Sequence, residues 1–145
     1  MTAISPALHL VDFDNVSPAT LQDQVRSAID AANAFLDTMP ALDSLPADRQ
    51  ISAEQALADV MSFDHINLAL DRSWGILSHL NSVMSNDDIR QVHHELLPKL
   101  SAYGTRVGQH QPLFGRYQAI KNDTAFFAAL EPARARAIEL ALRSF

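Results

Sequence analysis

Residues 17–40 read SPATLQDQVRSAIDAANAFLDTMP, and this stretch decides the fold. Ser17 can accept hydrogen bonds from the free N–H groups at a helix start, and Pro18 suits the first helical position because its missing N–H would be unpaired there anyway. Apolar residues then recur at steps of three or four, which places them on one face of a helix. They are Leu21, Val25, Ile29, Ala32, Leu36 and Met39. We therefore predict an amphipathic helix that ends before Pro40.

A second long helix is predicted after a linker. Residues 40–51 contain two prolines among polar residues, which is the composition of a linker. The helix is expected to begin at Ser52, with Gln55 in the capping-box position, and to run to about residues 79–83 with a bend near Trp74-Gly75. Its apolar positions are Leu57, Val60, Met61, Leu68, Trp74 and Leu77.

The third helix follows a short turn at residues 82–86. Asn86 is typical of a helix cap, and Asp87-Asp88 puts acids in the first turn, where the helix dipole favours them. Pro98 lies inside this helix and is expected to kink it. Its apolar residues are Ile89, Val92, Leu96, Leu97, Leu100 and Tyr103. The second and third helices should pack antiparallel, which would bury Leu80, Leu97, Leu100 and Tyr103.

Two shorter helices complete the prediction. One is expected from about Pro112 to Lys121, ended by Asn122-Asp123, and the last begins at Glu131-Pro132. No stretch alternates apolar and polar residues clearly enough to indicate a strand. The sequence therefore predicts an all-α fold, an antiparallel helical bundle of about five helices that forms one domain over residues 1–145.

The last helix has apolar residues on more than one face: Ile138, Leu140, Leu142 and Phe145. A contiguous apolar patch rarely stays bare on a soluble monomer. We expect the isolated chain either to form a homodimer as its concentration rises or to be a marginal, aggregation-prone monomer.

Composition excludes several classes of function. The 145 residues include no cysteine, so disulfide scaffolds, thiolate zinc sites and cysteine nucleophiles are excluded. The net charge of −6 argues against binding to nucleic acid or to an anionic membrane. None of the four glycines belongs to a phosphate-binding loop motif. No apolar run is long enough to span a membrane, and residues 1–10 do not resemble a secretion signal, which predicts an unprocessed cytoplasmic protein.

The histidines do not form a recognisable metal motif. A metalloprotease helix needs two histidines four residues apart, but counting from His94-Glu95 places Pro98 where the second must stand, and counting from His93 places Leu97 there. His65, beside Asp64, and His79 are fourteen residues apart on one helix, which is roughly 20 Å. We interpret all of them as residues of helix faces.

Other chemistry-bearing residues also favour structural roles. Four serines lack the context of a nucleophile elbow: Ser73, Ser78, Ser82 and Ser85. Asp87 and Asp88 serve better as a helix start than as an acid–base pair. Four aromatic residues are expected in the core rather than around a ligand: Trp74, Tyr103, Phe114 and Tyr117. The chain is thus predicted to hold no catalytic, cofactor-binding or metal-ligating residue, and not to be an enzyme by itself.

Three segments occur in an order that identifies a family resemblance. They are residues 78–83 (SHLNSV), 97–101 (LPKLS) and 103–109 (YGTRVGQ), followed by LEPAR at residues 130–134 and Glu139 and ALRSF near the end. Together they resemble the N-terminal region of bacterial oligopeptidase A, a member of the thimet oligopeptidase and neurolysin family of zinc metallopeptidases. The likeness is strong over residues 74–109 and loose before residue 52.

The resemblance implies a helical protein of several hundred residues whose lobes flank a channel for short peptides. In that family a His-Glu-x-x-His helix and a later glutamate hold the zinc, all in the C-terminal half, so no family catalytic residue can be placed on this chain. The implied function is a non-catalytic N-terminal domain that contributes to a lobe or channel wall, with the C-terminal catalytic region as its partner and zinc only in the full-length protein. The alternative is a stand-alone helical interaction module, and a small hydrolase or metal protein using His93, His94 and Glu95 ranks last.

Overall fold

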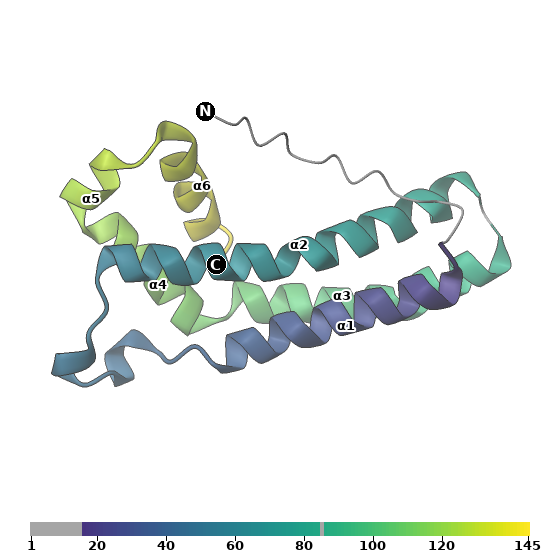
Figure 1. Ribbon diagram of the computed structural model, residues 1–145, viewed down its shortest axis with the longest axis horizontal. Helices are drawn as coiled ribbons and strands as arrows, with labels where there is room; N and C mark the ends of the chain where they lie inside the picture. The colour runs from purple at the N-terminus through teal and green to yellow at the C-terminus, as the bar shows by residue number, and fades with distance from the viewer. Residues whose placement is uncertain (1–15, 85) are drawn as a thin grey trace, which may run out of the picture.

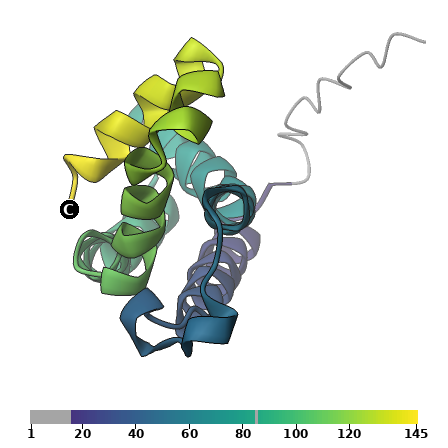
Figure 2. The same cartoon turned by 90° about the vertical axis from the view of Figure 1, so that its left-hand side faces the viewer.

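The computed structural model describes residues 16–84 and 86–145, and this part of the chain is helical without any strand. Three long helices lie side by side: α1 (Pro18–Asp37), α2 (Ala53–Val83) and α3 (Asp87–Gly108). They alternate in direction along the chain (Figure 1) and form a triangle when seen end-on (Figure 2). Three shorter helices, α4 (Gln111–Asn122), α5 (Thr124–Ala129) and α6 (Pro132–Leu142), cover one end. The predicted all-α antiparallel bundle is confirmed.

The helix starts follow the predicted capping chemistry. The Ser17 hydroxyl accepts from the Thr20 N–H at 3.1 Å, and the Asn86 side chain accepts from the Ile89 N–H at 2.8 Å. Ser52 likewise accepts from the Gln55 N–H at 3.1 Å. The side-chain amide of Gln55 donates to Asp59, rather than back to Ser52. Two 3₁₀ turns, η2 (Leu42–Ser44) and η3 (Ala47–Arg49), occupy the predicted linker.

The described residues contain six α-helices rather than about five, because α5 was missed. Asn122-Asp123 does end α4 as predicted. The Asp123 carboxylate, however, accepts from the Phe126 N–H at 3.0 Å and so caps a new helix immediately. The residue that stops one helix also starts the next.

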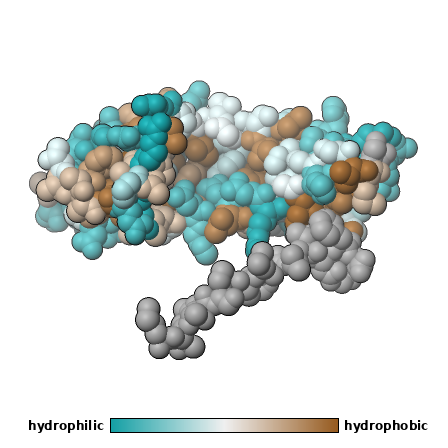
Figure 3. Space-filling view, turned by 90° about the horizontal axis from the view of Figure 1, so that it is seen from above, coloured by the Kyte–Doolittle hydropathy of each residue, from teal (hydrophilic) through white to brown (hydrophobic). Residues whose placement is uncertain are grey.

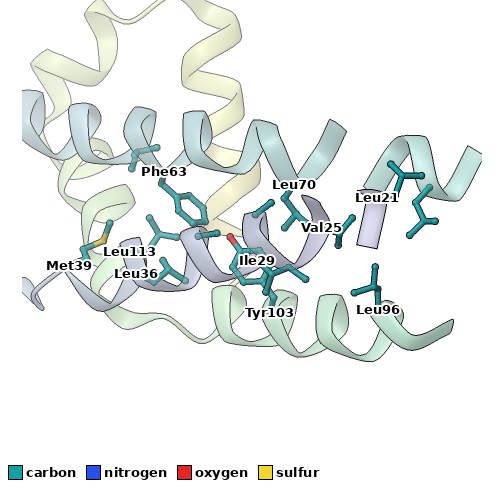
Figure 4. Packing of buried hydrophobic residues seen from close by; sticks show 14 of the residues in the cluster. Leu21, Val25, Ile29, Leu36, Met39, Phe63, Leu70, Leu96, Tyr103 and Leu113 are labelled. Atoms are coloured by element: carbon teal, nitrogen blue, oxygen red, sulfur yellow. The ribbon is translucent and has the colours of Figure 1, made fainter. Parts of the chain in front are cut away.

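The core is built from the inward faces of the three long helices and α4 (Figure 4). All six apolar residues of the predicted α1 face are buried, which confirms its register. On α3, Ile89, Val92, Leu96 and Tyr103 are buried, and Leu100 is half-buried. The predicted burial of Leu97 is wrong: it is 44% exposed, because Leu96 occupies the inward position and the next residue points about 100° away.

The second helix also departs from its predicted core. α2 continues without interruption through Trp74 and Gly75, and Leu80 is buried as expected. Met61 and Leu68, which were assigned to its apolar face, are 48% and 55% exposed. Val60 and Leu77 are buried as predicted, and the other buried apolar residues of α2 are Ala53, Ala56, Phe63, Leu70 and Leu80. None of the described helices has the length and apolar character needed to span a membrane.

The last helix is fastened more closely than predicted. Ile138 is buried, and the Phe145 ring packs against Phe114 and Tyr117 with centroids 5.4 and 5.8 Å apart. Among its large apolar residues Leu140 is the exposed one. Leu142 and Phe145 are half-buried, and both the apolar patch and the dimerisation of the chain stay predictions.

Candidate functional site

The candidate metal residues on α3 do not converge. The His93 ring stacks on the Trp74 indole of α2 with centroids 4.7 Å apart, whereas His94 is exposed. Glu95 accepts from the Gln22 amide at 2.7 Å and lies 3.8 Å from Arg26, both on α1. No group of three His, Cys, Asp or Glu side chains gathers in the described ranges. These contacts join α3 to its two neighbouring helices.

The other histidines lie on helix surfaces or at a helix start. His65 and His79 are exposed on α2. His110, which the sequence interpretation did not single out, caps α4: its Nδ1 accepts from the Leu113 N–H at 3.2 Å. Burial, and then the nearby Arg106 charge, lowers the pKa of His110 below its usual value of 6.5. Its position just before Gln111-Pro112 is the signal that could have identified this cap.

The hydroxyls of Ser73 and Ser82 bond to backbone carbonyls, and the two acids lie at the start of α3. Ser73 is buried, and its hydroxyl donates to the Ala69 carbonyl at 2.8 Å. The Ser82 hydroxyl donates to the Ser78 carbonyl at 2.9 Å, and Ser85 lies outside the described residues. Asp87 and Asp88 occupy the first turn of α3 as predicted, and Asp87 pairs with Arg90.

A buried ion pair that the sequence did not reveal joins three segments. Arg116 of α4 is 3% exposed, and its Nε donates to the Asp59 carboxylate of α2 at 2.8 Å. Its Nη1 donates to the carbonyls of Pro40 and Pro112 at 2.8 and 2.9 Å. Arg116 thereby fastens α4 to α2 and to the end of α1.

The outward side of α2 carries the surface that best suits the binding of another protein segment. A groove of about 510 Å³ lies between α2, the second half of α3 and the C-terminal segment. It is lined by Phe63, Asp64, Asn67, Leu68, Asp71, Tyr103, Gly104, Val107, Gly108 and Ser144. The Tyr103 hydroxyl donates to Asn67 at 2.5 Å, which holds one wall of the groove in place.

A second hollow of about 220 Å³ continues along α2 toward α4 and α6. It includes Met61 and Tyr117, and Asp64 lines both hollows. The wall from α6 is held by Lys121, whose Nζ donates to Glu139 at 2.7 Å. We call the exposed residues Met61, Asp64, Leu68 and Asp71 the α2 outer face.

The α2 outer face is acidic as well as apolar. Partial burial of its carboxyl, and then the charge of Asp71, raises the pKa of Asp64 above its usual 3.8. Burial, together with the Asp64 charge, raises the pKa of Tyr117 to about 12. Such a surface suits an apolar segment that carries positive charge. The signal for it was the spacing of Met61, Asp64, Leu68 and Asp71, which repeats at steps of three and four.

Comparison with known proteins decides the family. The family model of the neurolysin/thimet oligopeptidase N-terminal domain matches residues 41–145. The chain belongs to this family. The match covers α2 to α6 and begins after α1, in agreement with the loose resemblance before residue 52.

Relatives of this family member are named oligopeptidase A. The chain is 38% identical over 114 residues to oligopeptidase A of Haemophilus influenzae, which covers 73% of the chain and 17% of that protein. It is 33% identical over 116 residues to oligopeptidase A of Salmonella typhimurium, covering 74% of the chain and 17% of that protein. It is 40% identical over 76 residues to oligopeptidase A of Escherichia coli, and this alignment covers 52% of the chain and 11% of that protein. The chain thus spans a small part of the length of these relatives, and no solved structure matches it.

Proposed function

We propose that this chain acts as the non-catalytic N-terminal domain of an oligopeptidase A-like zinc metallopeptidase that degrades short peptides. The match of the family model over residues 41–145 carries this proposal. Catalysis and zinc binding would belong to the rest of the peptidase, as the resemblance implies. The isolated chain would then not cleave peptides.

The arrangement of the helices supports a role in a lobe or channel wall. The three long helices form an elongated body, and α4 to α6 widen one end of it (Figure 1). The α2 outer face leaves two apolar residues exposed, so the domain offers a surface for a further part of the protein. A domain that shapes a channel needs rigidity, and the buried Arg116–Asp59 pair supplies a fixed junction between α2 and α4.

A chimera tests this proposal. The segment of H. influenzae oligopeptidase A that is similar to this chain would be replaced by the chain, and cleavage of a quenched fluorescent peptide measured. We expect kcat/KM within roughly a hundredfold of the parent enzyme, the loss that a small misplacement of catalytic groups can cause. The enzyme with the segment deleted serves as the control.

A folded, zinc-loaded chimera with no more activity than the deletion control would contradict the proposal. That result would favour the alternative of a stand-alone helical interaction module. Circular dichroism and zinc content are measured beside activity, so that a misfolded chimera is recognised.

A further inference from the structure

The α2 outer face has the geometry of a helix-packing seam without its partner. Met61, Asp64, Leu68 and Asp71 follow at steps of three, four and three residues, so they form one stripe along α2. The opposite stripe of α2 is already buried against α1, α3 and α4. The outer stripe alternates apolar and acidic residues, so one side of the helix offers two apolar contacts and two negative charges. Seen from above, apolar residues interrupt the polar surface of this side of the molecule (Figure 3).

The surface next to this stripe is open enough for another helix. A Cβ added at Gly75, four residues beyond Asp71, would meet no atom within 4 Å apart from the neighbouring backbone of its own helix, and the same holds for Gly104, which lines the groove from α3. Leu68 lines one hollow and Met61 lines the other, and each hollow has room for an apolar side chain of a partner.

Charge specifies what that partner must carry. Asp64 and Asp71 are seven residues apart, which is about 10 Å along the helix. Within the described ranges neither carboxylate forms an ion pair, and the cation that lines the second hollow is Arg134 of α6. An incoming helix with Lys or Arg side chains at a matching seven-residue spacing would form an ion pair with each of the two carboxylates.

Two other occupants fit the charge poorly. A second copy packed symmetrically on this face would bring four aspartates together, and like charges at an interface are unfavourable. Residues 1–15 of the chain contain Asp12 and Asp14 and no lysine or arginine.

We propose that the α2 outer face docks an amphipathic helix from the catalytic region of the peptidase, with apolar residues over Met61 and Leu68 and two basic residues facing Asp64 and Asp71. This inference rests on the proposed function, because the relatives are peptidases much longer than this chain.

Binding in trans tests the docking surface. The probe is H. influenzae oligopeptidase A without the segment similar to this chain, and its affinity for the full chain is measured by calorimetry. Leu68→Glu and the double variant Asp64→Lys/Asp71→Lys should each weaken binding roughly tenfold or more, since they place a charge in an apolar contact or oppose like charges.

Matched controls lie on other surfaces. Leu97→Glu changes an exposed leucine of α3, and Asp23→Lys/Asp30→Lys reverses two exposed α1 carboxylates with the same seven-residue spacing. Both controls should bind like the unmodified chain. Each variant alters exposed side chains, and its folding is checked by circular dichroism.

The outcomes separate the two proposals. If the unmodified chain does not bind the folded probe, the proposed function fails, and the docking surface with it. If the chain binds but the α2 variants bind as tightly as the controls, the docking surface alone is wrong. Self-association of the chain that Leu68→Glu abolishes would also overturn it, in favour of a homodimer.

Discussion

Replacing Asp59 with alanine should destabilise this chain strongly, because it leaves the buried Arg116 guanidinium without its carboxylate partner. The Arg116 side chain is only 3% exposed, so water reaches its guanidinium poorly after the loss of the Asp59 carboxylate, which is itself 27% exposed. Removing one partner of a buried ion pair costs about 3–5 kcal/mol in the free energy of unfolding. The remaining hydrogen bonds of Arg116 go to the carbonyls of Pro40 and Pro112, which carry no compensating charge.

Urea unfolding, followed by circular dichroism and by the fluorescence of the single tryptophan, measures this loss. The exposed pair of Arg106 and Asp37 provides the control, and Asp37→Ala should cost under about 1 kcal/mol. The double variant Asp59→Leu/Arg116→Met removes both charges and should be more stable than Asp59→Ala alone. Equal losses for Asp59→Ala and Asp37→Ala would refute the reasoning.

Core packing on α3, two shifted pKa values and the absence of peptidase activity can each be tested on the purified chain. Leu96→Ala should lower the free energy of unfolding by about 2–5 kcal/mol, because Leu96 is fully buried in the core. Leu97→Ala changes the neighbouring exposed leucine and should lower it by under about 0.5 kcal/mol in the same urea titration. The pKa of His110 is lowered in the folded chain, so the unfolded chain binds a proton at a higher pH than the folded chain does, and stability should fall as the pH drops below 6.5. His110→Asn keeps a helix-capping side chain and should flatten that decline in Tm. The pKa of Asp64 is raised in the folded chain, so the folded state holds its proton more tightly than the unfolded state does. This contribution to stability is lost as the pH rises through the raised pKa. Asp64→Asn should therefore raise Tm near about pH 7 and leave it unchanged near about pH 3. Purified chain should not hydrolyse a quenched fluorescent peptide, and zinc-dependent cleavage that His94→Ala abolishes would contradict this.

Local patterns predicted most of the helices because each carries its own signals. The α1 face and the caps at Ser17, Ser52 and Asn86 depend on residues within one helical turn of each other. The same locality explains two errors. Asp123 was taken only as a break, although a residue can end one helix and cap the next, and Leu97 was judged by its apolarity rather than by its angle relative to Leu96.

The site was less predictable because it depends on pairs that are distant in the sequence. Arg116 meets Asp59 across 57 residues, and no local pattern indicates that contact. Met61 and Leu68 were assigned to the core because apolar residues usually are, yet the packing of α1, α3 and α4 uses the other side of α2. When apolar residues lie on more than one side of a helix, tertiary packing decides which side is buried.

Restoration of peptidase activity in trans tests the central claim most directly. H. influenzae oligopeptidase A that lacks the segment similar to this chain is mixed with increasing amounts of the purified chain, and cleavage of a quenched fluorescent peptide is followed. Cleavage should rise with the concentration of the chain and saturate, while the chain alone stays inactive. If the truncated enzyme is folded and zinc-loaded and its activity does not change at any concentration of the chain, the claim that this chain serves as the N-terminal domain of such a peptidase is contradicted.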